Sequence, residues 1–371
     1  MKILFLIPTL GNGGAEKTLL QLVNNYSIAG CDNSEIHVKC LFNKGNLINK
    51  LNDNVKFSFV FKHCFRGNIY FLKLFSPKFL FKRFIKEKYD IIVPFLEGPT
   101  TRIISGCNYD AKLLNWVHTS SNSVSVLAKS YRSKKELQKC YIKYDKTVFV
   151  AETAQKTFLA QFPELADISC SVVYNPINTE EVIENSNESC EILFDKTEFN
   201  IVSVGRMEKV KSFDRLIDVV SKLNKELDKR IHLYLIGDGS QREVLKNKVK
   251  DLKCEKFITF MGFKPNPYKY VKQSDLYVCS SLREGYSTSV IEALVLGIPV
   301  VTTDCSGMTE ILGHNQEYGL ITKNDEESLF EGIKSLLTDN TLYQKYKKSA
   351  EVRGKDFSLK DNIAKFKKVI E

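Results

Sequence analysis

Apolar segments of strand length alternate with longer stretches of helical periodicity through most of this chain, and the whole scheme occurs twice. In the first half the expected strands cover residues 2–8, 36–42, 89–95, 112–118 and 146–151. In the second half they cover residues 199–205, 231–237, 257–262, 275–281 and 298–304. Continuous Val- and Ile-rich strands separated by helices are typical of parallel sheets that helices cover on both faces. The pattern therefore predicts an α/β fold with two Rossmann-like domains in series.

The junction between these domains is expected near Val173–Asn178, where an Asn-Pro turn follows the end of a strand pattern. A length of 371 residues is sufficient for two domains that each bury a core of their own. We expect an N-terminal domain at residues 1–176, a C-terminal domain at 177–355 and a terminal helix at 356–371.

Several protein classes are excluded by composition and pattern. The hydrophobic content of 43% and the lack of long polar or repetitive tracts exclude general disorder. No apolar run reaches the roughly 18–20 residues that span a bilayer, and the apolar N-terminus precedes a glycine cluster rather than a cleavage site, so we expect a buried strand there. The ten cysteines contain no C-x-x-C pair, which indicates reduced, packed thiols in the cytosol rather than a zinc site or a disulfide scaffold.

The excess positive charge lies entirely in the first half of the chain. Residues 1–175 contain 24 Lys and Arg against 13 Asp and Glu, whereas the whole chain has a formal net charge of +10. Such an asymmetry indicates that one half faces an anionic partner, which could be nucleic acid, an acidic membrane surface or a phosphorylated substrate.

Residues 62–88, the basic aromatic segment, combine eight basic residues and one acidic residue with six phenylalanines. Lys78, Lys82 and Lys86 recur at every fourth position and form a cationic stripe if the segment is helical. We favour a patch that binds an anionic membrane surface, because the phenylalanines at 65, 71 and 75 exceed what one helix can bury. The alternative is a helix over the sheet whose lysines are merely solvated. Single-stranded nucleic acid also binds surfaces that combine basic side chains with aromatic rings. Nothing else in the chain is typical of a nucleic-acid-binding module, so no nucleic-acid partner is expected.

Ligands of open parallel sheets bind beyond the carboxyl ends of the strands, and glycine-rich or charged loops stand at those positions here. Residues 11–17, G-N-G-G-A-E-K, follow the first strand and let backbone N–H groups approach an anion or a sugar, or else form only a tight turn. Their spacing is not G-x-G-x-x-G, so a nicotinamide cofactor is not expected. Arg206 and Lys211 follow another strand and suit a diphosphate, unless the loop is simply a solvated basic one.

The strongest segment covers residues 280–294, and Glu284 lies within it, in the loop after the strand expected at 275–281. Residues 285–288 would supply N–H groups and hydroxyls at a helix N-terminus, which favours an anion. A carboxylate beside a phosphate site is explained if Glu284 accepts hydrogen bonds from sugar hydroxyls. Glu292 lies further along the helix, and its alternative role is a capping box with Ser289 that stabilises the helix by about 0.5–2 kcal/mol.

These motifs together resemble a retaining glycosyltransferase of family 4, in particular the capsule and exopolysaccharide enzymes. The resemblance rests on the glycine loop at 11–17, G-R-x-x-x-x-K at 205–211, G-D-G at 237–239 and the paired glutamates of E-G-Y-S-T-S-V-I-E-A at 284–293. The following A-L-V-L-G-I-P-V-V-T-T-D is similar to the family signature, and the first half also matches at Trp116-Val117-His118.

The resemblance implies a GT-B fold, in which two Rossmann-like domains with parallel sheets face a central cleft and the terminal helix crosses back to the first domain. It places the acceptor on the N-terminal domain and the nucleotide sugar on the C-terminal domain. Glu284 would hold the donor sugar, His118 would lie near that sugar (or be a packed strand-end histidine), and Arg206 and Lys211 would neutralise the leaving diphosphate. The residues implied in donor binding are Gly13, Gly14, Gly262, Phe263, Gly285, Tyr286, Ser287, Thr288 and Glu292.

The implied reaction moves a sugar from a nucleotide-diphosphate donor, most often a UDP-sugar, to a saccharide or polyprenyl-linked acceptor in cell-surface polysaccharide synthesis. No cofactor and no metal is expected, since the chain has no D-x-D motif. We expect the protein in the cytoplasm, peripheral on the inner face of the cell membrane. Two alternatives stay open: a nucleotide-sugar 2-epimerase, which shares the architecture, and a nucleotide-sugar-binding protein that has lost catalysis.

Overall fold

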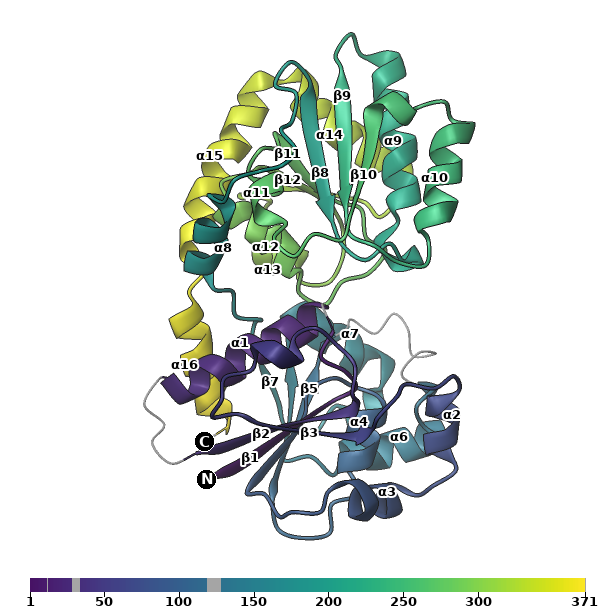
Figure 1. Ribbon diagram of the computed structural model, residues 1–371, viewed down its shortest axis with the longest axis vertical. Coiled ribbons are helices and arrows are strands. Elements are labelled where there is room, and N and C mark those ends of the chain that lie inside the picture. The colour runs from purple at the N-terminus through teal and green to yellow at the C-terminus, as the bar shows by residue number, and fades with distance from the viewer. Residues whose placement is uncertain (12, 29–33, 119–127, 371) are drawn as a thin grey trace. The chain divides into compact units, whose positions relative to one another are not determined.

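The computed structural model describes residues 1–11, 13–28, 34–118 and 128–370 (Figure 1). By their internal contacts these residues divide into two compact units. Unit 1 consists of Met1–Pro176 together with Leu359–Glu371, and unit 2 consists of Ile177–Ser358. Each unit contains one parallel sheet, which confirms the predicted fold class of two Rossmann-like domains.

The sheet of unit 1 has seven parallel strands in the order β3-β2-β1-β4-β5-β6-β7. Their bounds are β1 Lys2–Ile7, β2 Glu35–Phe42, β3 Lys56–Phe61, β4 Ile91–Pro94, β5 Lys112–Val117, β6 Lys146–Phe149 and β7 Cys170–Val172. Of the two edge strands, β3 was not predicted from the sequence, and β7 was indicated only by the end of a strand pattern near Val173. Neither is continuously buried, and the side chain of Phe59 in β3 is exposed.

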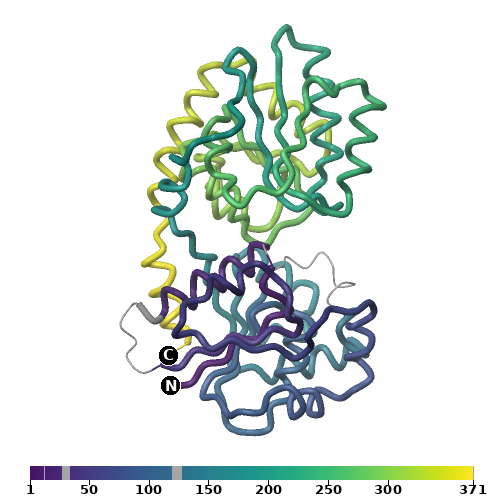
Figure 2. The backbone as a smooth tube through the Cα atoms, viewed as in Figure 1, coloured from purple at the N-terminus to yellow at the C-terminus, as the bar shows by residue number. Residues whose placement is uncertain are grey.

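Seven helices of unit 1 lie within the described residues. They are α1 Gly14–Ile28, α2 Asn68–Lys73, α3 Pro77–Phe84, α4 Pro99–Ile104, α6 Lys134–Tyr141, α7 Glu152–Gln161 and α16 Leu359–Ile370, with 3₁₀ turns η1 Ile48–Lys50 and η2 Pro163–Leu165. The terminal helix α16 lies beside α1 (Figure 2). Its Phe366 ring lies 5.1 Å from the Trp116 ring and 6.1 Å from the Phe5 ring, centroid to centroid. The last helix of the chain therefore completes the core of unit 1.

The sheet of unit 2 has six parallel strands in the order β10-β9-β8-β11-β12-β13. The strands are β8 Phe199–Val204, β9 Ile231–Ile236, β10 Ile258–Gly262, β11 Leu276–Cys279, β12 Val300–Thr303 and β13 Leu320–Thr322. The helices are α8 Thr179–Ser186, α9 Phe213–Glu226, α10 Arg242–Asp251, α11 Tyr268–Val271, α12 Thr288–Val295, α13 Met308–Leu312, α14 Glu326–Thr338 and α15 Asn340–Asp356, with 3₁₀ turns η3 Lys209–Lys211 and η4 Glu255–Phe257. Because β8 and β11 are neighbours, the loops at their carboxyl ends meet at one edge of the sheet.

Acid is expected to destabilise unit 1 through a buried histidine of β2. The ring of His37 contacts the hydroxyl of Tyr89 and, at 2.8 Å, that of Ser58, and burial lowers the pKa of His37 to about 4. Below about pH 6.5 the unfolded chain binds a proton at this histidine that the folded chain excludes, so stability falls as the pH drops. Between pH 6.5 and pH 5 the free energy of unfolding should fall by about 2 kcal/mol from this group alone.

Denaturant unfolding at several pH values checks this expectation. His37→Gln should flatten the pH dependence of the unfolding free energy over this interval, whatever its effect at pH 7. His63→Gln, a change at an exposed histidine of the same unit, should leave the slope as it is. An unaltered slope in His37→Gln would show that other groups cause the acid sensitivity.

Candidate active site

Two loops at the carboxyl edge of the unit 2 sheet are tied together by direct hydrogen bonds. The loop after β8 contains η3, and the loop after β11 leads into α12. The backbone N–H of Leu282 donates to the carbonyl of Val210 at 2.8 Å, and the Ser280 hydroxyl donates to the carbonyl of Lys211 at 2.9 Å. The segments 205–211 and 280–288, which the sequence analysis assigned to one site, therefore form one structural element.

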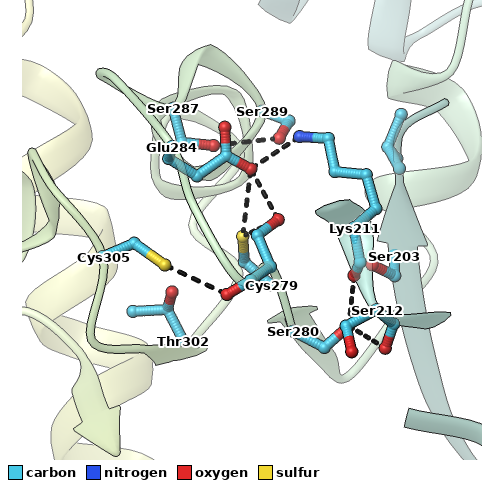
Figure 3. A network of polar contacts seen from close by, with 12 residues as sticks. Ser203, Lys211, Ser212, Cys279, Ser280, Glu284, Ser287, Ser289, Thr302 and Cys305 are labelled. Atoms are coloured by element: carbon cyan, nitrogen blue, oxygen red, sulfur yellow. Dashed lines mark hydrogen bonds and ion pairs between the residues drawn. The ribbon is translucent and has the colours of Figure 1, made fainter. Parts of the chain in front are cut away.

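Lys211 and Glu284 form an ion pair where these loops meet (Figure 3). The Lys211 Nζ lies 2.6 Å from the Glu284 Oε1, and the two side chains are 22% and 13% exposed. Burial by itself lowers the pKa of Lys211, but the Glu284 carboxylate outweighs burial and holds that pKa above its ordinary value. The amine therefore stays protonated at neutral pH, next to a carboxylate.

The hydrogen bonds that Glu284 makes with described residues all end on the same carboxylate oxygen. Besides Lys211, the Ser281 hydroxyl donates to Oε1 at 2.6 Å, and the Cys279 thiol lies 3.8 Å from it. Within the described parts of the chain, Oε2 accepts no hydrogen bond, and Figure 3 shows every dashed line of Glu284 reaching a single oxygen. One oxygen is therefore held by the protein, and the other can accept hydrogen bonds from a ligand.

Cationic and dipolar groups adjoin this pair. The aliphatic chain of Lys211 passes over Gly205, where a Cβ would lie 3.2 Å from the Lys211 Cε. Arg206 is exposed in the same loop and acts electrostatically on Lys211. Helix α12 starts at Thr288, and its N-cap residue Ser287 makes no side-chain cap hydrogen bond. The arrangement suits an anion near the Lys211 amine.

The alternative of a capping box between Ser289 and Glu292 is wrong, because Ser289 lies inside the first turn of α12 rather than at its N-cap. The Ser289 hydroxyl instead pairs with that of Ser287 at 3.3 Å. The carboxylate of Glu292 is largely buried and accepts a hydrogen bond from the Tyr268 hydroxyl at 3.3 Å. Burial, and then the Glu292 charge, raise the pKa of Tyr268.

The remaining predicted donor-binding residues of unit 2 lie in tight turns. Gly285 and Tyr286 pack against Gly307, whose φ of +81° and closeness to the Gly285 carbonyl leave no room for a Cβ. Gly262 ends β10 with a φ of +70°, and the Phe263 side chain after it is half exposed. The Phe263 ring is therefore accessible after β10, whereas Gly262 itself is buried.

The predicted site residues of unit 1 follow β1 and β5. Gly14 is the first residue of α1, and the space that a Cβ would take at Gly13 is filled by the Glu16 carboxylate. Asn12 of the same motif lies outside the described residues. His118 is buried, its backbone N–H donates to the Glu97 Oε2 at 2.8 Å, and burial lowers the pKa of His118 to about 3, so the imidazole is neutral. Its Nε2 has no hydrogen-bond partner among the described residues.

Three side chains at the site were missed by the sequence analysis: Cys279 and Ser281 at Glu284, and Tyr268 at Glu292. Ser281 lies in the segment singled out from the sequence, three residues before Glu284, but no role was predicted for it. Tyr268 lies 24 residues before Glu292 in the chain, and only the packing of α11 on α12 brings them together.

Residues 1–11, 13–28, 34–118 and 128–370 contain no cluster of three or more His, Cys, Asp or Glu side chains suited to a metal ion. Over the same ranges, no helix is both long enough and apolar enough to cross a bilayer.

The basic aromatic segment folds into two short helices, α2 and α3, rather than one. Helix α3 ends at Phe84, because Ile85 turns into the core with an extended backbone. Lys86 therefore lies beyond the helix, and the expected three-lysine stripe is shortened to Lys78 and Lys82. The rings at 61, 65, 71, 75 and 79 follow one another with centroid separations of 5.1–5.7 Å.

Two arginines hold the end of α2 in place. Arg102, which is 1% exposed and ion-paired with Glu136 at 2.9 Å, donates to the carbonyls of residues 72 and 75. Arg132 donates to the carbonyls of residues 73 and 74. These bonds satisfy the carbonyl groups of the last two residues of α2 and of the two residues that follow it, which a helix end otherwise leaves unpaired. The exposed side chains of Tyr70 in α2 (67%) and of Leu74, the C-cap residue of α2 (72%), are therefore presented from a fixed backbone.

Comparison with known proteins gives the class of this molecule. Residues 185–353 match the family model described as "Glycosyl transferases group 1". The N-acetylgalactosamine-N,N'-diacetylbacillosaminyl-diphospho-undecaprenol 4-alpha-N-acetylgalactosaminyltransferase of Campylobacter jejuni is 28% identical over 96% of this chain and 95% of its own. A second transferase of that organism, whose name specifies a GalNAc-GalNAc-diNAcBac-PP-undecaprenol substrate, is 24% identical over 97% and 95%. The crystal structure of HepE from Anabaena in complex with UDP superposes with a TM-score of 0.77 at 17% identity and covers 100% of this chain and 99% of its own.

The two parallel-sheet units, the matched region and these relatives together define a glycosyltransferase with the GT-B fold. The region that matches the group 1 glycosyl transferase model lies within unit 2.

Proposed function

We propose that this protein is a retaining glycosyltransferase of the family 4 type. It moves a sugar from a nucleotide-diphosphate donor to a saccharide carried on a polyprenyl lipid, in the synthesis of a cell-surface polysaccharide. The observation that carries the proposal is the contact between Glu284 and Lys211 at the carboxyl edge of the unit 2 sheet. The carboxylate, with one open oxygen, suits the sugar end of a nucleotide sugar, and the adjacent lysine, whose pKa is raised, suits its diphosphate end.

In this mechanism Glu284 accepts hydrogen bonds from donor-sugar hydroxyls through Oε2. Lys211, Arg206 and the N-terminus of α12 stabilise the negative charge that develops on the leaving diphosphate. The bond from the anomeric carbon to the diphosphate oxygen breaks, and the bond to the acceptor oxygen forms on the same face. The acceptor proton passes to the departing phosphate oxygen, so no protein nucleophile is needed. This front-face step is implied by the family resemblance.

The acceptor class is supported by the names of the two Campylobacter jejuni relatives, which both specify saccharides on undecaprenol diphosphate. UDP in the HepE complex supports a uridine donor. The roles of His118, Gly13 and Gly14 in donor binding, and of Gly262, Phe263 and Glu292 at the nucleoside, stay predictions.

A panel of nucleotide sugars, offered with and without a polyprenyl-diphosphate-linked saccharide and with EDTA present, tests the proposal. We expect acceptor-dependent transfer from one donor, with retained anomeric configuration and full rate in the chelator. Release of an epimerised free sugar without acceptor would identify an epimerase instead. Tight donor binding with neither hydrolysis nor transfer would identify a binding protein without catalysis.

The proposal includes peripheral attachment to the inner face of the membrane through the basic aromatic segment. The same segment exposes apolar side chains and seven basic residues; the basic ones are Lys62, Arg66, Lys78, Lys82, Arg83, Lys86 and Lys88. Each basic residue near an anionic surface contributes about 1 kcal/mol to membrane binding, and the aromatic rings and Leu74 can enter the headgroup region.

Replacement of both Tyr70 and Leu74 by serine should weaken vesicle binding about tenfold or more, since it removes two apolar side chains from the lipid. Sedimentation with vesicles of equal parts phosphatidylglycerol and phosphatidylcholine measures the effect. Ile142→Ser, at an exposed aliphatic residue of unit 1 outside the segment, is the matched control and should bind normally. Wild-type protein that fails to bind these vesicles at low salt would refute membrane attachment.

A further inference from the structure

We infer that Ser281 is a positioning residue for the reaction: its hydroxyl holds Glu284 in the orientation that presents Oε2 to the donor sugar. The inference rests on the role proposed for Glu284 and assigns a function to a residue for which the sequence analysis predicted no role. It is carried by the hydrogen bonds of Ser281, which link the Glu284 carboxylate to the core of unit 2.

The backbone of Ser281 is anchored more firmly than that of a typical loop residue. Its carbonyl accepts hydrogen bonds from three side chains, the Thr303 hydroxyl at 2.6 Å, the Cys305 thiol at 3.0 Å and the Asn324 amide at 3.3 Å. The residue is 1% exposed. Because the main chain is held from behind and the buried side chain rotates about only one carbon–carbon bond, the hydroxyl is close to a fixed donor.

The Ser281 hydroxyl and the Lys211 amine both donate to Glu284, but they differ in how freely they can move. Lys211 reaches Glu284 through a long chain of rotatable bonds and could follow the carboxylate if it turned. The Ser281 hydroxyl, at 2.6 Å from the same Oε1, cannot follow. Two donors on one oxygen, one of them immobile, set the direction of the other oxygen, and hydrogen bonds to a charged acceptor are among the stronger ones in proteins.

A purely structural explanation is that the bond to Glu284 only gives the buried Ser281 hydroxyl a hydrogen-bond partner. Two nearby buried serines show which partners such hydroxyls have in this unit. Ser280, equally buried, donates to the carbonyls of Lys211 and Ser212 at 2.9 and 3.1 Å (Figure 3). Ser203 donates to the carbonyl of Val278 at 2.7 Å. Both bind main-chain oxygens, as buried hydroxyls usually do. Ser281 instead donates to the carboxylate that faces the proposed donor.

The test compares Ser281→Ala with Ser203→Ala, which removes an equally buried hydroxyl from the same sheet without touching Glu284. The turnover number of Ser281→Ala should fall by about 10- to 100-fold, the range expected when a reacting group is misplaced. Its dissociation constant for nucleoside diphosphate should stay within about threefold of wild type, because that ligand lacks the sugar. Ser203→Ala should keep its turnover number, although both variants lose a comparable amount of thermal stability.

A turnover number of Ser281→Ala within about threefold of wild type would overturn the inference. A parallel loss of turnover and nucleoside diphosphate affinity would overturn it too, since that pattern indicates a distorted loop. Glu284→Ala, measured alongside, separates the two hypotheses. If Glu284→Ala transfers sugar normally, the proposed role of Glu284 fails; if it is inactive while Ser281→Ala is fully active, only the role of Ser281 fails.

Discussion

Glu284→Ala is expected to lower the turnover number of sugar transfer by about 10²- to 10⁴-fold, while the affinity for nucleoside diphosphate changes by no more than about threefold. The physical reason is that Oε2 is proposed to contact the sugar, whereas the diphosphate interacts with Lys211, Arg206 and the α12 N-terminus. Steady-state transfer and calorimetric titration with the nucleoside diphosphate measure the two quantities separately.

Glu284→Gln is the matched control, because it keeps the size of the side chain and an oxygen acceptor but removes the charge that pairs with Lys211. We expect its turnover number to lie between those of wild type and Glu284→Ala. Equal losses of transfer and of nucleoside diphosphate affinity in Glu284→Ala would contradict the sugar role and indicate a general collapse of the site.

Lys211→Met is expected to weaken nucleoside diphosphate binding and kcat/KM together, each by about 10²-fold. Methionine retains an aliphatic stem over Gly205, so the change removes mainly the charge. The variant also leaves the Glu284 carboxylate without its cation, next to the position proposed for an anion, which adds repulsion to the lost attraction. Titration with nucleoside diphosphate and initial rates at several donor concentrations provide both numbers.

Lys209→Met is the control for this change, since Lys209 is an exposed lysine of the same 3₁₀ turn. It should bind nucleoside diphosphate and transfer sugar as the wild type does. If Lys211→Met retained wild-type affinity for nucleoside diphosphate, Lys211 would serve only to hold Glu284, and the anion site would have to be built from Arg206 and α12 alone.

The central strands of both sheets could be predicted because their burial on two faces requires uninterrupted apolar residues, as in β4 and β11. The edge strand β3 escaped prediction, since its pattern mixes exposed and half-buried positions. The basic aromatic segment was predicted as one helical region, but Ser76, which caps α3, and Ile85, which turns inward, divide and end its helices. The local periodicity of the sequence does not show where a cap or an inward-turning residue divides a helical region.

For the site, loop positions after strands were enough to select Glu284, Lys211 and Arg206, because parallel sheets bind ligands at that edge. The same reasoning could not show that Lys211 contacts Glu284 directly, nor that every donor reaches the same oxygen. Lys211 and Glu284 are separated by 73 residues, and their distance depends on the pairing of β8 with β11.

The residues alone thus specify the type of fold and the kinds of group at the ligand edge, because burial periodicity and loop chemistry are local properties. Which groups meet, and in which direction a carboxylate points, follows from the strand order and from the donors that Thr303, Cys305 and Asn324 aim at Ser281. Those contacts join segments far apart in the chain, and hydrogen-bond geometry exists only once the segments have packed.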